Sequence, residues 1–371
     1  MNLELTDEQV ALREAAQGAL TRVADLEVLR SALEGGARPE NWDLVAEQGW
    51  AGLLVSEANG GVGLSLFDAQ LILIEAGKVL ASHELLGHLP ATVALDAASY
   101  AGTADYAEGT KRAAFLPVIP PSDLEPSWTT QPRGGSAPAP APTLNADGTV
   151  SGDVAWVIDA PGADLLAGVA VDGSGAAKTV AIETGASGVS VEGPVLRYDS
   201  SRLLGHVSLT NAPATVLEGA DPQRAWYVAQ ALLAAESYGA VETALTVSVE
   251  YAKERFTFGR QIGSYQAVKH ALVEILRQRE NAYAVLLYSG YSYEDKPEEF
   301  AVAASAARTA AGHAFDYAAR TQIATHGGIG ATWEHDAPLY FRRSQLSRRL
   351  LGGIGASTDR VAGELLAAAA A

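Results

Sequence analysis

The sequence contains no cysteine and few basic residues, and both shortages exclude classes of function. Without cysteine there are no disulfides, no thiolate nucleophile and no cysteine-based metal site. The chain has 26 Lys and Arg against 44 Asp and Glu, a formal net charge of −18. Because nucleic-acid binding needs clustered positive charge to neutralise phosphates, we expect no nucleic-acid partner.

Long apolar runs are missing as well. No run approaches the ~18 residues that a membrane-spanning helix needs, so no membrane partner is expected. The opening residues, MNLELTDEQVALREAA, do not combine a basic stretch with an apolar core, which argues against a secretory signal. These features favour the cytoplasm. At 371 residues the chain can bury a large core, and this length favours two or three domains.

Three regions of different composition follow one another. In residues 1–113, Thr6 followed by Gln9 fits a capping box at the start of an apolar helical stripe. Residues 114–217 hold short Val- and Ile-rich runs between Pro, Gly and Ser, which is typical of a small β domain. Residues 218–371 carry long helical stripes joined by short loops, which predicts a bundle. The fold class is therefore α+β, with helices, then strands, then helices.

Three segments, in this order, resemble the acyl-CoA dehydrogenase family across most of the chain. They read WDLVAEQGWAGLLVSEANGGVGLS (42–65), YAKERFTFGRQIGSYQAVKH (251–270) and ATHGGIGATWEHDAPLYFRRSQ (324–345). The resemblance implies an N-terminal helical domain, a central β domain and a C-terminal four-helix bundle. It also implies FAD as cofactor and an acyl-CoA thioester as substrate.

The family's residues that hold the ADP half of FAD match six positions here. The resemblance carries these roles to Arg255, Phe258, Gln266, Gly327, Gly328 and Gly330. The chemistry is suitable, since a guanidinium donates two hydrogen bonds to a phosphate and glycines let backbone N–H groups approach it. The alternative for the Arg–Gln motif alone is a solvated basic turn between helices. The sequence departs from the family at Ala324, where a Gln is common.

The catalytic base of the family is missing. In the family reaction, a carboxylate removes the α proton of the thioester while a β hydride passes to the flavin. The resemblance implies two places for this Glu, which are here Leu351 and Gln223, the latter directly after the predicted helix cap Asp221 and Pro222. Leu has no lone pair and a Gln amide does not accept a proton near neutral pH, so we expect no catalytic residue in this chain.

The flavin-ring contacts also differ from the family pattern. The family's β-domain loop cannot be recovered from FLPVIPPSDLEPSWTTQPRGGS (115–136). The next motif appears as Trp156-Val157-Ile158, with Ile where a hydroxyl would contact the ring. In this family the ADP-holding motif reaches a neighbouring subunit's flavin, whereas the ring contacts and the base come from the flavin's own chain.

Our leading hypothesis is therefore a subunit without its own base that completes the FAD site of a homologous partner carrying the catalytic Glu. This matches the resemblance to the non-catalytic subunits of actinobacterial heteromeric acyl-CoA dehydrogenases, which implies an α2β2 heterotetramer and a bulky or sterol-derived acyl group. A self-sufficient homotetrameric flavoenzyme, with a relocated base or with oxidase or monooxygenase chemistry, is the alternative. A flavin-free scaffold or binding protein is the second alternative.

Other polar residues give weaker signals. Glu236 interrupts an apolar stretch and is the candidate for a relocated base, while His326 is either a packed residue or a contact to FAD or substrate. Trp333-Glu334-His335-Asp336 is better explained by helix capping and an interface than by a metal site, because successive residues point in different directions. No metal is expected. Four arginines could bind a CoA phosphate or form an interface: Arg342, Arg343, Arg348 and Arg349.

Overall fold

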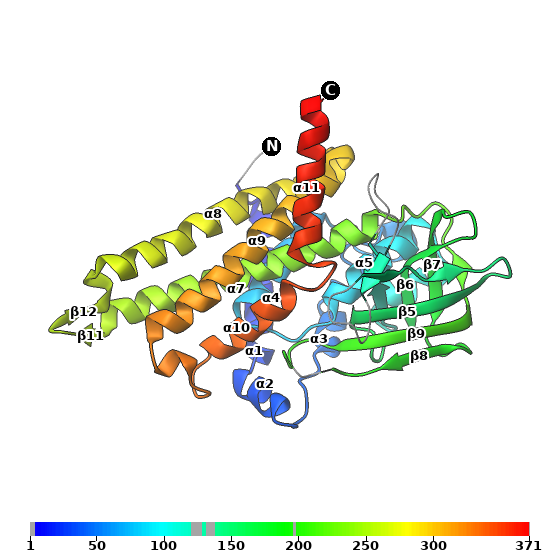
Figure 1. The fold of residues 1–371 in the computed structure, drawn as a ribbon. Helices are drawn as coiled ribbons and strands as arrows, with labels where there is room; N and C mark the ends of the chain where they lie inside the picture. The colour runs from blue at the N-terminus through cyan, green and yellow to red at the C-terminus, as the bar shows by residue number, and fades with distance from the viewer. Residues whose placement is uncertain (1–3, 120–127, 131–137, 196–197, 371) are drawn as a thin grey trace.

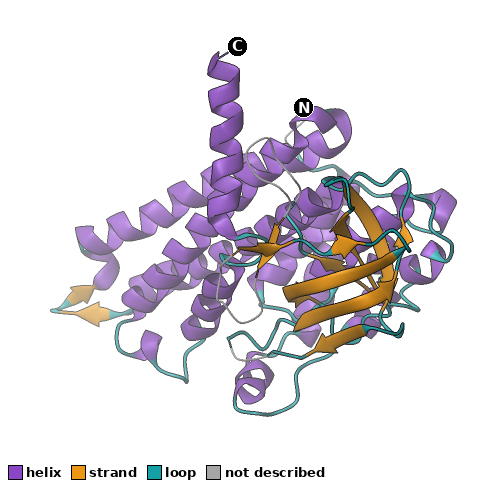
Figure 2. Cartoon of the chain, turned by 45° about the vertical axis from the view of Figure 1, so that its right-hand side comes forward, coloured by secondary structure: helices purple, strands orange, loops and turns teal. Residues whose placement is uncertain are grey.

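The computed structural model describes residues 4–119, 128–130, 138–195 and 198–370. Figure 1 shows a helical part that lies beside a curled sheet. In Figure 2 the strands of this sheet lie in front, with helices behind them. This architecture confirms the predicted α+β class, with helices at both ends of the sequence and strands between them. None of the helices in these ranges is long and apolar enough to cross a membrane.

The N-terminal region is helical. Its elements are α1 (Asp7–Val23), α2 (Leu26–Leu33), α3 (Trp42–Glu47), η1 (Trp50–Gly52), η2 (Glu57–Asn59), α4 (Leu66–Lys78), α5 (Leu85–Ala97) and α6 (Thr103–Ala107). The predicted capping box is present, because Thr6 accepts from the backbone of Gln9 and the Gln9 side chain accepts from Thr6 in return. Ser65 and Asp68 cap α4 in the same way. These caps satisfy N–H groups that the first helical turn leaves unpaired.

The central region forms the sheet. Its strands are β1 (Ala113–Leu116), β2 (Trp128–Thr130), β3 (Pro138–Pro140), β4 (Thr143–Leu144), β5 (Thr149–Ile158), β6 (Leu165–Val171), β7 (Ala177–Glu183), β8 (Val189–Glu192), β9 (Leu204–Pro213) and β10 (Thr215–Val216). Eight strands form one sheet in the order β10-β7-β6-β4-β5-β9-β8, with β1 pairing β6 in parallel, while β2 and β3 form a separate hairpin. Inside the sheet, Val154, Val157, Leu166 and Val207 belong to a small apolar core.

The C-terminal region is the helical bundle. It contains α7 (Arg224–Glu254), β11 (Phe256–Thr257), β12 (Arg260–Gln261), η3 (Ile262–Ser264), α8 (Gln266–Asp295), α9 (Pro297–His326), η4 (Ile329–Ala331), α10 (Ala337–Ser347) and α11 (Gly353–Ala370). In Figure 1, α7, α8 and α9 run side by side, and the β11–β12 hairpin lies at the left end of the molecule. The predicted start of α7 was wrong by two residues, since Asp221 accepts the N–H of Gln223 in a preceding turn and the helix begins at Arg224.

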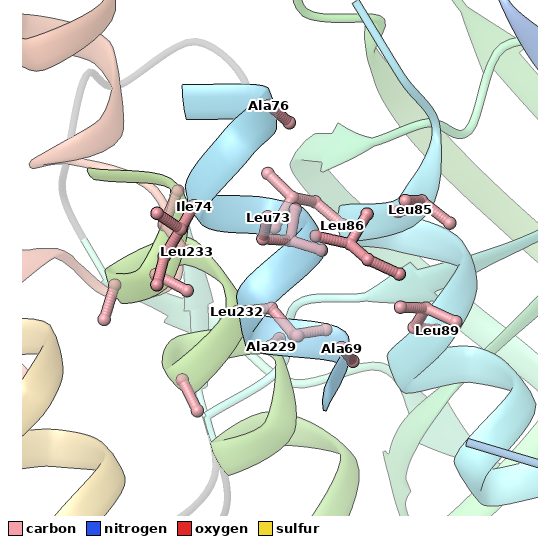
Figure 3. Close-up of a cluster of buried hydrophobic side chains, with 14 of the residues drawn as sticks. Ala69, Leu73, Ile74, Ala76, Leu85, Leu86, Leu89, Ala229, Leu232 and Leu233 are labelled. Carbon is pink, nitrogen blue, oxygen red and sulfur yellow. The ribbon is translucent and has the colours of Figure 1, made fainter. Parts of the chain in front are cut away.

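The main core joins the first region to the bundle. Figure 3 shows α4 between α5 and α7, where Leu73 lies beside Leu86 and Ile74 beside Leu233. These four side chains are at most 4% exposed, and each fully buried leucine contributes about 1.5–3 kcal/mol to stability. This packing fixes α4 against the middle of α7.

Two glycines let α4 and α7 approach unusually closely. A Cβ at Gly77 would lie 1.9 Å from the carbonyl oxygen of Glu236, and a Cβ at Gly239 would lie 1.9 Å from that of Ile74. Any larger residue at either position would therefore push the two helices apart. The contact brings the loop after α4, which carries His83, next to Glu236.

Candidate functional site

The β11–β12 hairpin carries Phe258 at its tip, and the flanking residues Arg255 and Gln266 also lie on the surface. Phe258 and Gly259 form its two-residue turn with φ values of 52° and 77°, and positive values at both positions are those of a type I′ hairpin turn. The Phe258 side chain is 92% exposed. Arg255 directly follows α7 and Gln266 begins α8, and both side chains are exposed.

Arg255 has an available guanidinium. Its backbone N–H donates to Tyr251 and its carbonyl accepts from Ile262, so its main chain is fixed. Its side chain, in contrast, makes no hydrogen bond or ion pair with any residue that the structure describes. A fixed backbone that carries an unpaired guanidinium is suited to hold a phosphate or a carboxylate.

The glycine turn after α9 has two open positions and one packed position. Gly327 (φ 65°) closes the helix, and a Cβ at Gly327 or Gly328 would meet no atom within 4 Å. At Gly330 a Cβ would lie 2.7 Å from both the His326 Cβ and the Ile323 carbonyl oxygen. Gly327 and Gly328 thus leave room for a ligand, whereas the need for glycine at Gly330 comes from packing within the turn.

A ring stack brings the hairpin and the glycine turn to the same end of the molecule. Tyr251, one helical turn before Arg255, stacks on His326 with ring centroids 4.3 Å apart. The His326 side chain is packed and its Nδ1 lies 2.8 Å from the Gln322 carbonyl oxygen, which agrees with the packed interpretation of this histidine. Segments about 70 residues apart in sequence therefore form one surface.

Glu236 lies in a buried charge cluster and is not an available base. Arg202 binds both of its carboxylate oxygens, with a distance of 3.0 Å to Oε1, and Arg343 donates to Oε1 at 3.1 Å. His83 Nε2 is also 3.1 Å from Oε1. Although burial opposes ionisation, the two arginine charges hold the pKa of Glu236 well below its usual range. Glu236, the candidate for a relocated base under the self-sufficient alternative, therefore does not suit that role, because a strongly paired carboxylate does not take up a proton at neutral pH.

The sequence interpretation missed the partners of this cluster. Arg202, Asp199 and His83 lie in loops whose composition gave no signal, and Arg343 stood among four arginines considered for a CoA phosphate. Arg343 is 1% exposed and also pairs with Asp199 at 3.2 Å, so it belongs to the interior. The phosphate expectation for Arg343 is therefore corrected.

Two other arginines of this segment, Arg342 and Arg348, make contacts within the chain, whereas Arg349 is exposed. Arg348 pairs with Asp316 at 3.3 Å, and Arg342 donates to the Tyr198 carbonyl at 2.6 Å. A hollow of about 510 Å³ lies between α8 and α9, and Asp316 is among the residues that line it. None of the predicted site residues lines this hollow.

The two expected base positions hold Gln223 and Leu351, as the sequence indicates. Gln223 lies in the turn before α7 and is half-buried. Leu351 lies between α10 and α11, is 6% exposed and adopts a positive φ of 53°. Neither side chain supplies a proton acceptor.

The Trp333–Asp336 segment ties the glycine turn to α2. Trp333 Nε1 donates to Glu34 at 2.9 Å, and Asp336 forms an ion pair with the buried Arg30. The Ala337 N–H donates to His335 Nδ1 at 3.0 Å. Among the residues that the structure describes, no group of three or more His, Cys, Asp or Glu side chains could hold a metal ion.

The predicted flavin-ring contacts fall on the 115–136 loop and on Trp156–Ile158. Residues 120–127 and 131–137, which include much of the predicted loop, lie outside the described residues. Trp156 lies at an irregularity of β5 with a positive φ of 57°, and its ring contacts His206 edge-on at 4.8 Å. The loss of ring contacts therefore stays a prediction.

Comparison with known proteins defines the family. The model of the acyl-CoA dehydrogenase N-terminal domain matches residues 6–109, and that of the C-terminal domain matches residues 223–366. IpdE2, an acyl-CoA dehydrogenase of Mycolicibacterium smegmatis, is 30% identical over 358 residues, 94% of this chain and 96% of that protein. The chain belongs to the acyl-CoA dehydrogenase family. IpdE2 of Mycobacterium tuberculosis is 31% identical over 93% of both chains.

Solved structures of the acyl-CoA dehydrogenase family share the fold. A Tcur3481–Tcur3483 steroid acyl-CoA dehydrogenase variant is 26% identical, with a TM-score of 0.85 over 98% of this chain and 99% of that one. The ChsE4–ChsE5 complex of Mycobacterium tuberculosis superposes with a TM-score of 0.83 at 21% identity, covering 99% of each chain. An FAD complex of PigA has the same fold, at 18% identity and a TM-score of 0.82. That structure is named as a complex with FAD, which is also the cofactor expected here from the sequence.

Proposed function

We propose that this acyl-CoA dehydrogenase chain is the non-catalytic subunit of a heteromeric enzyme and completes the FAD site of a homologous partner subunit. The observation that carries the proposal is the unpaired guanidinium of Arg255 at the same end of the molecule as the open glycines Gly327 and Gly328. The two expected base positions, meanwhile, hold Leu351 and Gln223. The chain thus has groups that can bind a diphosphate, but no proton acceptor at the two positions where the family carries its catalytic base.

The described residues fit the ADP half of FAD. Arg255 would hold the pyrophosphate, Gly327 and Gly328 would let backbone N–H groups approach it, and Gln266 and Phe258 would contact the neighbouring part of the nucleotide. When bound, FAD accepts the hydride from the acyl-CoA, while the partner's Glu removes the α proton. The exposed Phe258 supports an intersubunit site, because a 92% exposed aromatic ring gains stability once another chain covers it.

The relatives support the heteromeric assembly. Two of the solved structures with this fold are named as pairs of chains, Tcur3481–Tcur3483 and ChsE4–ChsE5, and the first is named as a steroid enzyme. We extend this to an α2β2 assembly that acts on a bulky or sterol-derived acyl group. The cytoplasmic location expected from the sequence is part of the same proposal. The pairing of Glu236 argues against the self-sufficient alternative with its base at that position.

The deciding experiment measures flavin absorbance and subunit stoichiometry for the chain alone and after co-expression with a homologous subunit that carries the Glu. The proposal expects a colourless chain alone and a yellow complex with fewer flavins than chains. A yellow protein with one flavin per chain in the absence of a partner would instead favour a self-sufficient enzyme. A complex that forms without any flavin would favour the scaffold alternative.

A further inference from the structure

His326 is the last residue of α9, and its imidazole contacts two other rings. The Tyr251 ring stacks on it, with centroids 4.3 Å apart and planes inclined by 30°. The His335 ring lies at a centroid distance of 4.4 Å and an angle of 51°. His326 is only 5% exposed. The stack therefore joins the end of α7, the end of α9 and the segment that leads into α10.

We call Arg255, Gly327 and Gly328, the residues proposed to hold the diphosphate of FAD, the FAD grip. Each part of it is attached to this stack through the backbone. The Arg255 N–H donates to the Tyr251 carbonyl at 2.9 Å, so the position of Arg255 follows that of Tyr251. Gly327 is bonded directly to His326, and the turn closes tightly over the His326 side chain at Gly330. A shift of the His326 ring would move the arginine and the glycines relative to each other.

Hydrogen bonds hold both imidazoles of the stack in place. His326 Nδ1 faces the Gln322 carbonyl at 2.8 Å and must donate, because a carbonyl only accepts. His335 Nδ1 accepts the Ala337 N–H at 3.0 Å, which ties this ring to the first residue of α10.

The groups around the stack shift the pKa of His335 in opposite directions. Burial lowers the pKa of His335, and His326 and Arg30 lower it further, while Asp336 opposes them. Asp336 is itself paired with Arg30, which reduces the support it gives to an imidazolium. On the α7 side, the titratable side chain that contacts the His326 ring is Tyr251.

We propose that His326 is the positioning residue of the FAD grip: its ring, stacked on Tyr251, holds the Arg255 end of α7 and the Gly327–Gly328 turn at the spacing that the diphosphate requires. This inference rests on the proposed function. Tight FAD binding therefore needs an aromatic ring at position 326.

The test uses the full chain in complex with its homologous subunit, with FAD itself as the probe. His326→Ala removes the stack and weakens FAD binding by at least about tenfold, as expected for one loosened charge-assisted contact. His326→Phe keeps an aromatic ring that cannot be protonated, so it binds FAD like the wild type at neutral pH. His313→Ala, a change at an exposed histidine of the same helix, leaves FAD binding unchanged.

Two outcomes would overturn the positioning role: unchanged FAD affinity in His326→Ala, or FAD binding by His326→Phe that is as weak as that of His326→Ala. Should His326→Ala fail to fold, the FAD affinity of His326→Phe decides alone, and weaker binding than the wild type overturns the role. Arg255→Ala in the same complex separates this inference from the proposed function. If Arg255→Ala weakens FAD binding and the His326 variants do not, only the positioning role fails. If Arg255→Ala has no effect, the proposed function fails.

Discussion

Arg202 and Glu236 form a forked ion pair inside the protein, although one lies in the loop before β9 and the other in the middle of α7. Both side chains are at most 3% exposed, and Arg343 from α10 donates to the same carboxylate at 3.1 Å. The cluster therefore links the β domain to two helices of the bundle. Its carboxylate is used for structure, which leaves none at this position for catalysis.

Glu236→Gln should destabilise the protein without a specific effect on chemistry. The substitution removes the negative charge that Arg202 and Arg343 share, and breaking a buried pair in this way costs about 3–5 kcal/mol of unfolding free energy. Glu250→Gln, an exposed position on the same helix, is the control and should change stability by less than about 0.5 kcal/mol. Urea unfolding measures both. Equal stability of the two variants would contradict a structural role for Glu236.

Asp159 should make the protein less stable as the pH rises. Burial, reinforced by the nearby Glu84 carboxylate, raises the pKa of Asp159 to about 8 from its ordinary 3.8. Between these pH values the folded state keeps a proton that the unfolded state has released, so the free energy of unfolding falls with rising pH and levels off above the folded pKa. Asp159→Asn should remove this decline. Asn tolerates the positive φ of 65° and can still accept the Gly87 N–H.

The measurement for Asp159 is the urea midpoint at a series of pH values for the wild type and Asp159→Asn. Asp153→Asn serves as the control, because Asp153 is exposed and lies on β5, the strand that ends directly before Asp159. If the wild-type and Asp159→Asn curves stay parallel over the whole range, Asp159 does not carry a proton in the folded protein.

Arg255→Ala should lower the flavin content of the complex. Loss of a charge-assisted contact of about 1.5–3 kcal/mol corresponds to FAD binding that is roughly 10- to 100-fold weaker. Arg260→Ala is a control in the same hairpin, since its guanidinium lies over the Tyr265 ring at 4.0 Å. Flavin absorbance per complex after gel filtration gives the result, and equal flavin content in all three proteins would count against a phosphate role for Arg255.

Gln223→Ala should leave turnover of the complex nearly unchanged. Gln223 occupies one of the family's base positions but cannot accept a proton there. The matched variant changes the catalytic Glu of the homologous subunit to Gln and should abolish turnover. Steady-state rates with an acyl-CoA substrate compare the two. A complex inactivated by Gln223→Ala would show that this chain contributes directly to the chemistry.

Gly328→Ala and Gly330→Ala should separate ligand binding from packing. A Cβ at Gly328 meets nothing within 4 Å, so Gly328→Ala should keep its stability while FAD binding weakens. A Cβ at Gly330 would lie 2.7 Å from the Ile323 carbonyl oxygen, so Gly330→Ala should lose about 1–3 kcal/mol of stability through overpacking. Thermal unfolding and flavin content are measured together. If Gly328→Ala binds FAD normally, no diphosphate approaches the backbone there.

Local sequence patterns predicted the helices and strands and pointed to the surface residues that we propose hold FAD. The capping box at Thr6 and Gln9, the helix that begins at Pro297 and the turn at Gly327 each depend on a few neighbouring residues, whose hydrogen bonds and φ values are local properties. The absence of a base at Gln223 and Leu351 also needed no structure, because the chemistry of a side chain is fixed by its identity.

Tertiary structure alone decided the interior. His83 and Glu236 are 153 residues apart in sequence and 3.1 Å apart in space, and no local pattern connects them. The same holds for the stack of Tyr251 on His326 and for the difference between the open Gly328 and the packed Gly330. A buried charge or a close backbone approach depends on which surfaces the fold brings together, and the identity of a residue does not specify its distant neighbours.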